Sequence, residues 1–315
     1  MGEMGRRNRG VPIHGWLVID KPPGLSSNNV VGRIRHATNA AKVGHGGTLD
    51  PLATGLLPLA LGEATKTVSY AMDSKKGYRF TVCWGEARNT DDREGVITQV
   101  SNIRPKRDQI SEILKKFIGE IEQTPPNFSA IKIGGKRAYN LARANKAIKL
   151  KSRTIQVEDF RLIRIIDDDH AEFQVLSGKG AYMRALARDV ALSLGTVGHI
   201  SSLRRISIGK FSEKDAIPLD NFLDKLNSLG HSAPLSEHLL PIETVLDDIP
   251  ALNLTQPEAR KLVRGQAVPV LPVARRSPLG DINHGEVICA MAEGRLVALA
   301  KIFGGEIRPF RVMNF

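Results

Sequence analysis

Two strand-like stretches joined by four polar residues constrain the fold more than any other feature of the chain. Residues 153–166 (RTIQVEDFRLIRII) and 171–178 (AEFQVLSG) flank the turn sequence DDDH at 167–170. So short a connection joins antiparallel neighbours, because parallel strands need a crossover of about a dozen residues or more. Other strand-like and helical stretches alternate along the chain. We therefore expect an α+β fold, with a mixed, mainly antiparallel central sheet flanked by helices.

A change in composition predicts two domains. Residues 229–250 contain glycine, serine, histidine and three prolines, which is typical of a linker. We therefore expect a first domain over residues 1–245 and a small β-rich domain over 250–315. In the first domain, residues 26–37 predict a helix with Ser27 or Asn28 as its N-cap. Residues 128–146 predict a strand, a Gly-Gly turn and a helix.

The charge of the chain indicates a nucleic-acid partner. Lysine and arginine number 45 against 33 acidic residues, a net charge of +12. A generically basic surface is the alternative, but residues 123–157 contain no acidic residue at all. Basic residues and interspersed aromatics suit RNA, because they combine phosphate contacts with base stacking. The predicted RNA-binding segment contains Phe128, Tyr139 and eight cations, namely Lys132, Lys136, Arg137, Arg143, Lys146, Lys149, Lys151 and Arg153.

Several classes of protein are disfavoured. The two cysteines, Cys83 and Cys289, are too distant and too few for a disulfide framework or a cysteine metal site. The longest largely apolar run, Leu52 to Gly62, is about half of a membrane span. The eight histidines show no spacing typical of metal ligands. We expect a cytoplasmic protein that binds no metal.

The stretch HGGTLDPLATG (45–55) holds one charged residue, Asp50. The chain has neither a Walker sequence nor the G-x-S-x-G elbow that an esterase would need. An isolated aspartate in a loop is commonly a turn former. It becomes a nucleophile or base if a cation keeps it ionised in a dry pocket. Lys21, Lys66 and Arg184 are candidate cations, and composition does not choose among them.

The stretch GHGGTLDPLATGLLPLALGEATK (44–66) resembles the signature of TruB-type tRNA pseudouridine synthases. Further stretches match in the family's order, and the resemblance covers the chain from Gly15 to Phe315. They are LVIDKPPGLSSN (17–28), KGYRF (76–80), PPNFSAIKIGGKRAYNLAR (125–143), SGKGAYMRALARD (177–189) and ISSLRRISIGKF (200–211). The C-terminal segment resembles the small PUA-related RNA-binding domain of the bacterial members.

The resemblance implies that the protein isomerises uridine 55 in the T-loop of tRNA to pseudouridine. The base is flipped out, the N1–C1′ bond breaks and a C5–C1′ bond forms. The resemblance implies no cofactor, no metal, no membrane association and no obligate protein partner. We expect a monomer.

The resemblance also assigns roles to residues of the reacting centre. Asp50 corresponds to the catalytic carboxylate, which attacks C1′ or removes a proton from C2′; the sequence leaves both routes open. Arg184 corresponds to the arginine that pairs with this aspartate. Tyr78 corresponds to a tyrosine stacked on the flipped uracil, with a hydroxyl suited to moving the C5 proton.

Other matching positions are expected to bind RNA. His45 corresponds to a residue that fills the space left in the T-loop stack, and Lys21 and Lys66 to basic residues near the site. Leu203 corresponds to an apolar wall of the uracil pocket, with core packing as an equal alternative. Lys132, Lys136, Arg137 and Arg143 are expected to contact the RNA, and Gly46 and Gly47 to let its backbone approach closely.

One stretch departs from the family pattern. Arg88, Asn89 and Thr90 stand where Thr-Asp-Thr is expected, so Asn89 keeps the shape of the family aspartate without its charge. Asp91 is a candidate to supply the missing carboxylate. A non-catalytic module that binds or folds tRNA is the main alternative function, and it is compatible with catalysis.

Overall fold

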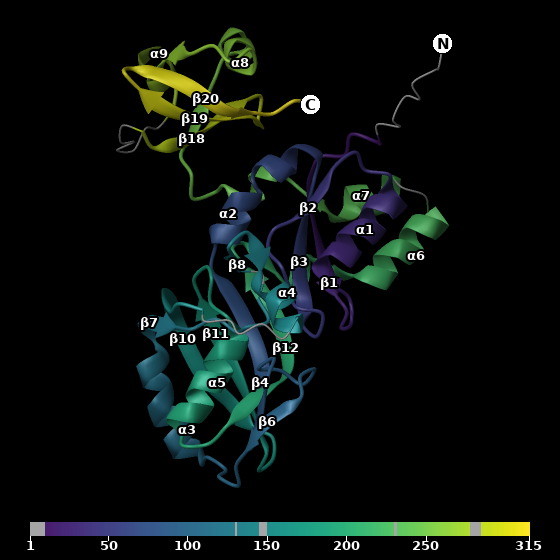
Figure 1. Ribbon diagram of the computed structural model, residues 1–315. Helices are drawn as coiled ribbons and strands as arrows, with labels where there is room; N and C mark the ends of the chain where they lie inside the picture. Colours follow the sequence, from purple (N-terminus) through teal and green to yellow (C-terminus); the bar gives the residue numbers. More distant parts are fainter. Residues whose placement is uncertain (1–9, 130, 145–149, 230–231, 278–284) are drawn as a thin grey trace.

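The computed structural model describes residues 10–129, 131–144, 150–229, 232–277 and 285–315. Its largest element is a sheet of 11 strands (Figure 1). The main path is β14 (Ala216–Pro218), β1 (Gly15–Lys21), β3 (Thr54–Leu61), β12 (Gly198–Ile208), β4 (Lys76–Trp84), β11 (His170–Ser177), β10 (Arg153–Ile165) and β7 (Gly119–Gln123). Three short strands branch from this path: β2 (Val43–His45) on β3, β13 (Phe211–Ser212) on β12 and β15 (Leu239–Leu240) on β1.

Strand directions in this sheet are mixed. The β1–β14 and β12–β3 pairs are parallel, and the other pairs are antiparallel. The β10–β11 hairpin turns at DDDH, where the Asp167 carboxylate accepts a hydrogen bond from the main-chain N–H of Asp169 at 2.9 Å. The α+β fold with a mixed, mainly antiparallel sheet is therefore confirmed.

Helices cover the sheet at both ends (Figure 1). Helices α1 (Ser27–Thr38) and α6 (Leu219–Leu229) lie at one end, and α3 (Arg107–Leu114) and α5 (Met183–Ser193) at the other. Their buried faces share one apolar core with the strands, to which Ile34, Phe222 and Leu186 contribute. The shorter helices are α2 (Val68–Asp73), α4 (Ala138–Arg143) and α7 (Ser232–His238), with 3-10 turns at Gly62–Lys66, Lys115–Phe117, Glu213–Asp215 and Ile242–Val245. Within the described ranges, no helix combines the length and apolarity needed to cross a membrane.

Helix α1 begins one residue earlier than expected. Its N-cap is Ser26, whose hydroxyl accepts a hydrogen bond from the main-chain N–H of Asn29 at 3.1 Å. The Asn29 side chain in turn accepts from the main-chain N–H of Ser26, which completes a capping box. The prediction of Ser27 or Asn28 as the cap was wrong, and the hydroxyl of Ser27 is left to bond elsewhere.

The segment predicted as a linker is largely structured. Helix α7 and strand β15 occupy much of residues 232–240, and β15 pairs antiparallel with Trp16 and Leu17 of β1. Apolar residues account for this, because Leu235 is buried and Leu239 packs against the main core. Residues 235–245 thus pack against the large sheet and do not form a free connection.

The Gly-Gly turn in the basic segment closes a hairpin. Strands β8 (Lys132–Ile133) and β9 (Lys136–Arg137) pair around Gly134 and Gly135, and α4 follows. Both glycines have positive φ, as a two-residue hairpin turn requires. The prediction had the strand, turn and helix but lacked the second strand. A further hairpin joins β5 (Glu86–Arg88) to β6 (Ile97–Val100).

The last part of the chain forms a second sheet. Its order is β16 (Ala251–Asn253), β18 (Val287–Ala292), β19 (Arg295–Phe303), β20 (Glu306–Val312) and β17 (Val268–Pro269), with helices α8 (Gln256–Val263) and α9 (Val270–Ala274). One apolar cluster joins this unit to the large sheet, because Leu299 and Met313 pack in it with Trp16 and Phe211. The Lys66 ammonium also donates to the carbonyl of Val312 at 2.6 Å.

Gly55 allows β3 and β12 to approach each other closely. It pairs with Arg205 across the parallel contact, at a φ of 94°. A Cβ at this position would lie 2.2 Å from the main-chain oxygen of Arg205. Gly119 has a similar φ of 97°, but a Cβ there would meet no atom within 4 Å.

We predict that Gly55→Ala destabilises the protein by roughly 3 kcal/mol or more, because backbone strain and a main-chain clash add together. Gly119→Ala is the matched control, since it introduces the strain without the clash and should cost about 1–2 kcal/mol. Urea unfolding midpoints would measure both. Equal losses of stability in the two variants would contradict this, because they would show that β3 and β12 move apart to accept the added methyl group at no further cost.

Candidate active site

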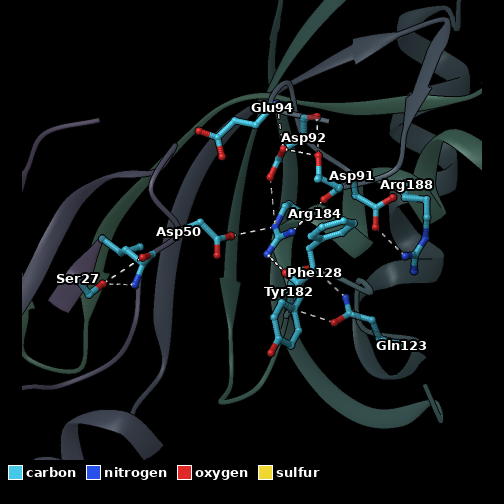
Figure 2. Close-up of polar contacts among 12 residues, drawn as sticks. Ser27, Asp50, Asp91, Asp92, Glu94, Gln123, Phe128, Tyr182, Arg184 and Arg188 are labelled. Atoms are coloured by element: carbon cyan, nitrogen blue, oxygen red, sulfur yellow. Dashed lines mark hydrogen bonds and ion pairs between the residues drawn. The ribbon is translucent and has the colours of Figure 1, made fainter. Parts of the chain in front are cut away.

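Asp50 lies on the loop between β2 and β3, at the centre of the large sheet. Its carboxylate Oδ2 accepts a hydrogen bond from Nε of Arg184 on α5 at 2.9 Å (Figure 2). Oδ1 of Asp50 has no hydrogen-bond partner within the part of the chain that the structure describes. The Asp50 side chain is 35% exposed and that of Arg184 only 4%. One carboxylate oxygen is therefore fixed by a buried cation while the other is free.

Arg184 joins two further segments to the Asp50 loop. Its Nη1 donates to the carbonyl of Thr90 and its Nη2 to the carbonyl of Phe128, both at 2.9 Å. A second carboxylate, that of Asp92, lies 3.7 Å from Nε. The planar guanidinium presents its donors in a fixed fork, so these contacts orient it completely. The direction in which Asp50 is held follows from that orientation.

The carboxylate that supports Arg184 is Asp92, not the expected Asp91. Asp92 is buried, and its Oδ1 accepts from the Thr90 hydroxyl at 2.6 Å. Asp91 instead pairs with Arg188 at 2.9 Å. The Asn89 side chain accepts from the main-chain N–H of Val96 at 3.0 Å and thereby closes the turn. The proposal that Asp91 compensates for Asn89 is therefore wrong.

Helix α5 also holds the start of the basic segment. Gln123 and Tyr182 exchange two hydrogen bonds, from the Gln123 amide to the Tyr182 carbonyl and from the Tyr182 N–H back to the Gln123 side chain. One turn after Arg184, Arg188 donates to the carbonyl of Thr124 at 2.7 Å. Residues 123–128 are thus fixed to the helix that carries Arg184.

Tyr78 and Leu203 lie on the neighbouring strands β4 and β12, and β12 pairs with Thr54 and Gly55 directly after the Asp50 loop. Tyr78 on β4 and Leu203 on β12 are both nearly buried, and both belong to the main apolar cluster together with Leu49 and Leu52. Leu203 therefore packs in the core, which was one of its two predicted roles. The proximity of both residues to the loop agrees with an apolar floor beneath Asp50.

Lys21 lies beneath the loop rather than on a surface open to RNA. Its side chain is fully buried, and its ammonium donates to the carbonyls of Pro22, Leu25 and Pro51 at 2.8–3.1 Å. Burial lowers the pKa of Lys21 to about 8, and the negative charge of Asp50 opposes this shift. The structure thus differs from the prediction of an RNA contact and makes Lys21 an internal support of the loop.

Lys66 lies away from Asp50. Its ammonium binds the Glu63 carboxylate at 2.5 Å and the carbonyl of Val312 in the C-terminal unit. Strand β3 separates the two positions, because its eight residues rise by roughly 3.3 Å each. Lys66 therefore contributes to the junction between the two sheets, which contradicts the prediction that it lies near the site.

His45 is partly buried, and the glycines after it, Gly46 and Gly47, are buried. The His45 Nδ1 accepts from the main-chain N–H of Gly47 at 3.3 Å, and burial together with the charge of Arg205 lowers the pKa of the imidazole. A Cβ on Gly46 would lie 3.1 Å from Ala71 and 3.2 Å from the Trp16 ring. Tight internal packing thus explains Gly46, in contrast to the expected approach of an RNA backbone.

The predicted RNA contacts in the basic segment lie on identifiable elements. Lys132, Lys136 and Arg137 are in the β8–β9 hairpin, and Arg143 ends α4. The side chains of these four residues, and all of residues 145–149, lie outside what the structure describes. Their roles in binding remain predictions from the sequence. No group of three or more potential metal ligands occurs among the described residues.

Sequence reasoning missed Arg205. Its guanidinium is fully buried and donates to the carbonyls of Leu56 and Gly47 at 2.7 and 3.0 Å, with a longer contact of 3.4 Å to that of Thr48. No carboxylate pairs with it among the described residues. Strand alternation was an available signal, because Arg205 lies two positions from the buried Leu203 and therefore on the same face.

The partly buried pair of Asp91 and Arg188 gives a prediction about pH. Burial raises the pKa of Asp91 to about 6, and the charge of Arg188 only partly opposes this shift. The contribution of Asp91 to stability is therefore fully present below about pH 4 and is lost as the pH rises through 6. Asp91→Asn mimics the protonated form, so the variant should gain stability relative to the wild type between pH 4.5 and 7, by up to roughly 3 kcal/mol. Urea midpoints at both pH values would measure this gain, and a difference independent of pH would contradict it.

The chain matches two family models in succession. Residues 35–183 match the TruB family pseudouridylate synthase (N terminal domain), and residues 184–247 match the tRNA pseudouridylate synthase B C-terminal domain. Among solved structures, a Cbf5-Nop10-Gar1 complex aligns with a TM-score of 0.72 at 26% identity, over 96% of this chain and 85% of that chain. An H/ACA RNP bound to a substrate RNA containing 2′-deoxyuridine aligns with a TM-score of 0.74 at 24% identity, over 99% and 92%, which supports the fold alone.

Curated relatives match along the whole chain. The tRNA pseudouridine synthase B of Rhodospirillum rubrum is 56% identical over 311 residues, which are 99% of this chain and 100% of the relative. That of Caulobacter vibrioides is 48% identical over 312 residues, or 99% of each chain. Identity at this level and coverage establishes the family. The chain therefore belongs to the TruB family of tRNA pseudouridine synthases.

Proposed function

We propose that this enzyme converts uridine 55 in the T-loop of tRNA to pseudouridine, with Asp50 as the catalytic carboxylate. The observation that carries the proposal is the state of Asp50, whose Oδ2 is fixed by buried Arg184 while Oδ1 is free among the described residues. A carboxylate held in this way is oriented and partly open to a ligand. Acceptor groups fixed before the substrate arrives need little reorganisation during the reaction.

The proposed reaction is an isomerisation in which all atoms are retained apart from an exchanged proton. The N1–C1′ bond breaks, the uracil rotates, C5 bonds to C1′, and the C5 proton passes to solvent while N1 gains one. Asp50 assists either by attacking C1′ or by removing a proton from C2′. Because a base inside a folded loop is inaccessible, the uridine must first be flipped out of the T-loop. Tyr78 and Leu203 are proposed to form the apolar floor on which the uracil lies.

The test of catalysis is tritium release from tRNA transcript labelled at uridine C5. We predict that Asp50→Asn abolishes release, by about 10³-fold or more, because the amide is neither a nucleophile nor a base. Asp169→Asn is the control, because it removes a carboxylate from an exposed ion pair with Arg104. Release from wild-type protein that persists in Asp50→Asn would overturn the role of Asp50. The same inactive variant measures any contribution to tRNA folding that does not depend on chemistry.

We also propose that the basic segment 123–157 binds the tRNA. The support is its lack of acidic residues and the attachment of residues 123–128 to α5, which joins the segment to the helix that carries Arg184. Binding energy from phosphate contacts would then be gained close to the reacting base.

Replacing Lys136, Arg137 and Arg143 together with glutamine should weaken tRNA binding and flatten its dependence on salt. The slope of log affinity against log salt should fall by about 0.7–0.9 for each phosphate that the variant no longer neutralises. The control replaces Arg107, Lys115 and Lys116, which removes the same charge from exposed positions on and after α3. Filter binding at several salt concentrations would compare the two. Equal slopes in the two variants would place the RNA elsewhere.

A further inference from the structure

The main chain next to Asp50 is held by one buried hydroxyl. Ser27, the first residue of α1, is 2% exposed. Its hydroxyl accepts a hydrogen bond from the main-chain N–H of Leu49 at 2.8 Å and donates to the carbonyl of Leu49 at 3.1 Å (Figure 2). A single side chain thus satisfies both main-chain polar groups of the residue that precedes Asp50.

The start of α1 explains why this hydroxyl is available. Two serines stand together, and the first of them, Ser26, caps the helix with Asn29. Ser27 has no capping role, and its hydroxyl faces the loop instead. The pair of residues fixes the helix and the loop to each other at one point.

The rest of the loop is held in the same manner, through its carbonyls. Arg205 bonds those of Gly47 and Thr48, on one side of Leu49, and Lys21 bonds that of Pro51 on the other side of Asp50. The Asp50 carboxylate itself is hydrogen-bonded only to Arg184 among the described residues. The main chain therefore fixes the base of the Asp50 side chain, and Arg184 fixes its carboxylate.

We propose that Ser27 is a positioning residue for the isomerisation, which acts through the Leu49 peptide groups on Asp50. This inference rests on the function proposed for Asp50. Without the hydroxyl, a buried N–H and a buried C=O would lose their partner, and the loop would shift to satisfy them. A displacement of about 1 Å at a reacting group can cost on the order of 10²-fold in rate. Ser27 has almost no exposed surface, so its removal should leave RNA binding unchanged.

The test is Ser27→Ala, assayed by single-turnover conversion of tRNA with excess enzyme and by equilibrium tRNA binding. We expect the rate constant to fall by roughly 10–100-fold, while the dissociation constant stays within about twofold. This division between rate and binding separates a positioning role from a general loss of folded protein, which would lower the apparent binding capacity as well.

Helix α1 offers a matched control at its other end. Thr38 is 1% exposed, and its hydroxyl donates to the carbonyl of Ile34 at 2.7 Å and accepts from the main-chain N–H of Ala40 at 3.3 Å. Thr38→Val thus removes the same kind of doubly bonded hydroxyl from the same helix, away from Asp50. We expect a comparable loss of stability with an unchanged rate constant.

The outcomes separate the two proposals. If the wild type is active, Asp50→Asn is inactive and Ser27→Ala reacts at the wild-type rate, the role of Ser27 is refuted while that of Asp50 stands. A rate loss in Thr38→Val equal to that in Ser27→Ala also refutes it, because instability alone would then explain both. If the wild type converts no uridine in tRNA, the proposed function itself fails.

Discussion

The guanidinium of Arg184 is the interaction on which the site depends. Its donors bind a loop of the central sheet at Asp50, a turn after β5 at Thr90 and the start of the basic segment at Phe128. A buried arginine without these acceptors would be strongly destabilising, because a buried charge needs hydrogen-bond partners. The stability of α5 in its position and the geometry of Asp50 therefore have the same cause. A substitution that disturbs one of the three segments is transmitted to the others through this single group.

Local patterns predicted much of the fold. A connection of four polar residues specifies a hairpin, and the two strand-like stretches that flank it form β10 and β11. Helix boundaries that depend on individual hydrogen bonds were harder to predict from the sequence. Either serine at the start of α1 is a suitable cap, and only the contact of Ser27 with Leu49 distinguishes them. Residues 229–250 have the composition of a linker, but Leu239 and Leu240 within them pair with Trp16 and Leu17 of β1.

Part of the site was predicted from the sequence, and the resemblance to the family contributed more to this than the physical properties of the residues. Asp50 and Arg184 are separated by 134 positions, so no local pattern could bring them together. Asp50 and Lys66 belong to one sequence motif, which suggested that they lie close together. In the structure Lys66 lies beyond the far end of strand β3, beside Val312 of the C-terminal unit. Ser27 and Arg205 escaped prediction because they act on carbonyls and N–H groups of the main chain, which the side-chain sequence does not reveal.

The buried cations around the loop share one feature. Arg205, Lys21 and Lys76 bind main-chain carbonyls, and burial lowers the pKa of both lysines to about 8. Carbonyl dipoles solvate a charge without cancelling it, unlike a carboxylate. Among the described residues no carboxylate forms an ion pair with Lys21, Lys76 or Arg205, although Asp50 itself lies near enough to Lys21 to affect its pKa. Positive charge beneath the loop is favourable for a polyanionic ligand such as RNA.

The apolar cluster between the two sheets has a consequence for dissecting the enzyme. Trp16 and Phe211 of the large sheet share one buried apolar cluster with Leu299 and Met313 of the C-terminal unit. Cutting the chain near residue 247 would uncover the Trp16 ring on β1, the strand that ends at Lys21, and the Phe211 ring on β13. Weak activity in a shortened enzyme would therefore reflect an uncovered, destabilised scaffold as much as poorer binding of the substrate. Substitutions of exposed residues on α8 leave this apolar cluster intact. They are therefore the better way to test whether the C-terminal unit contacts the substrate.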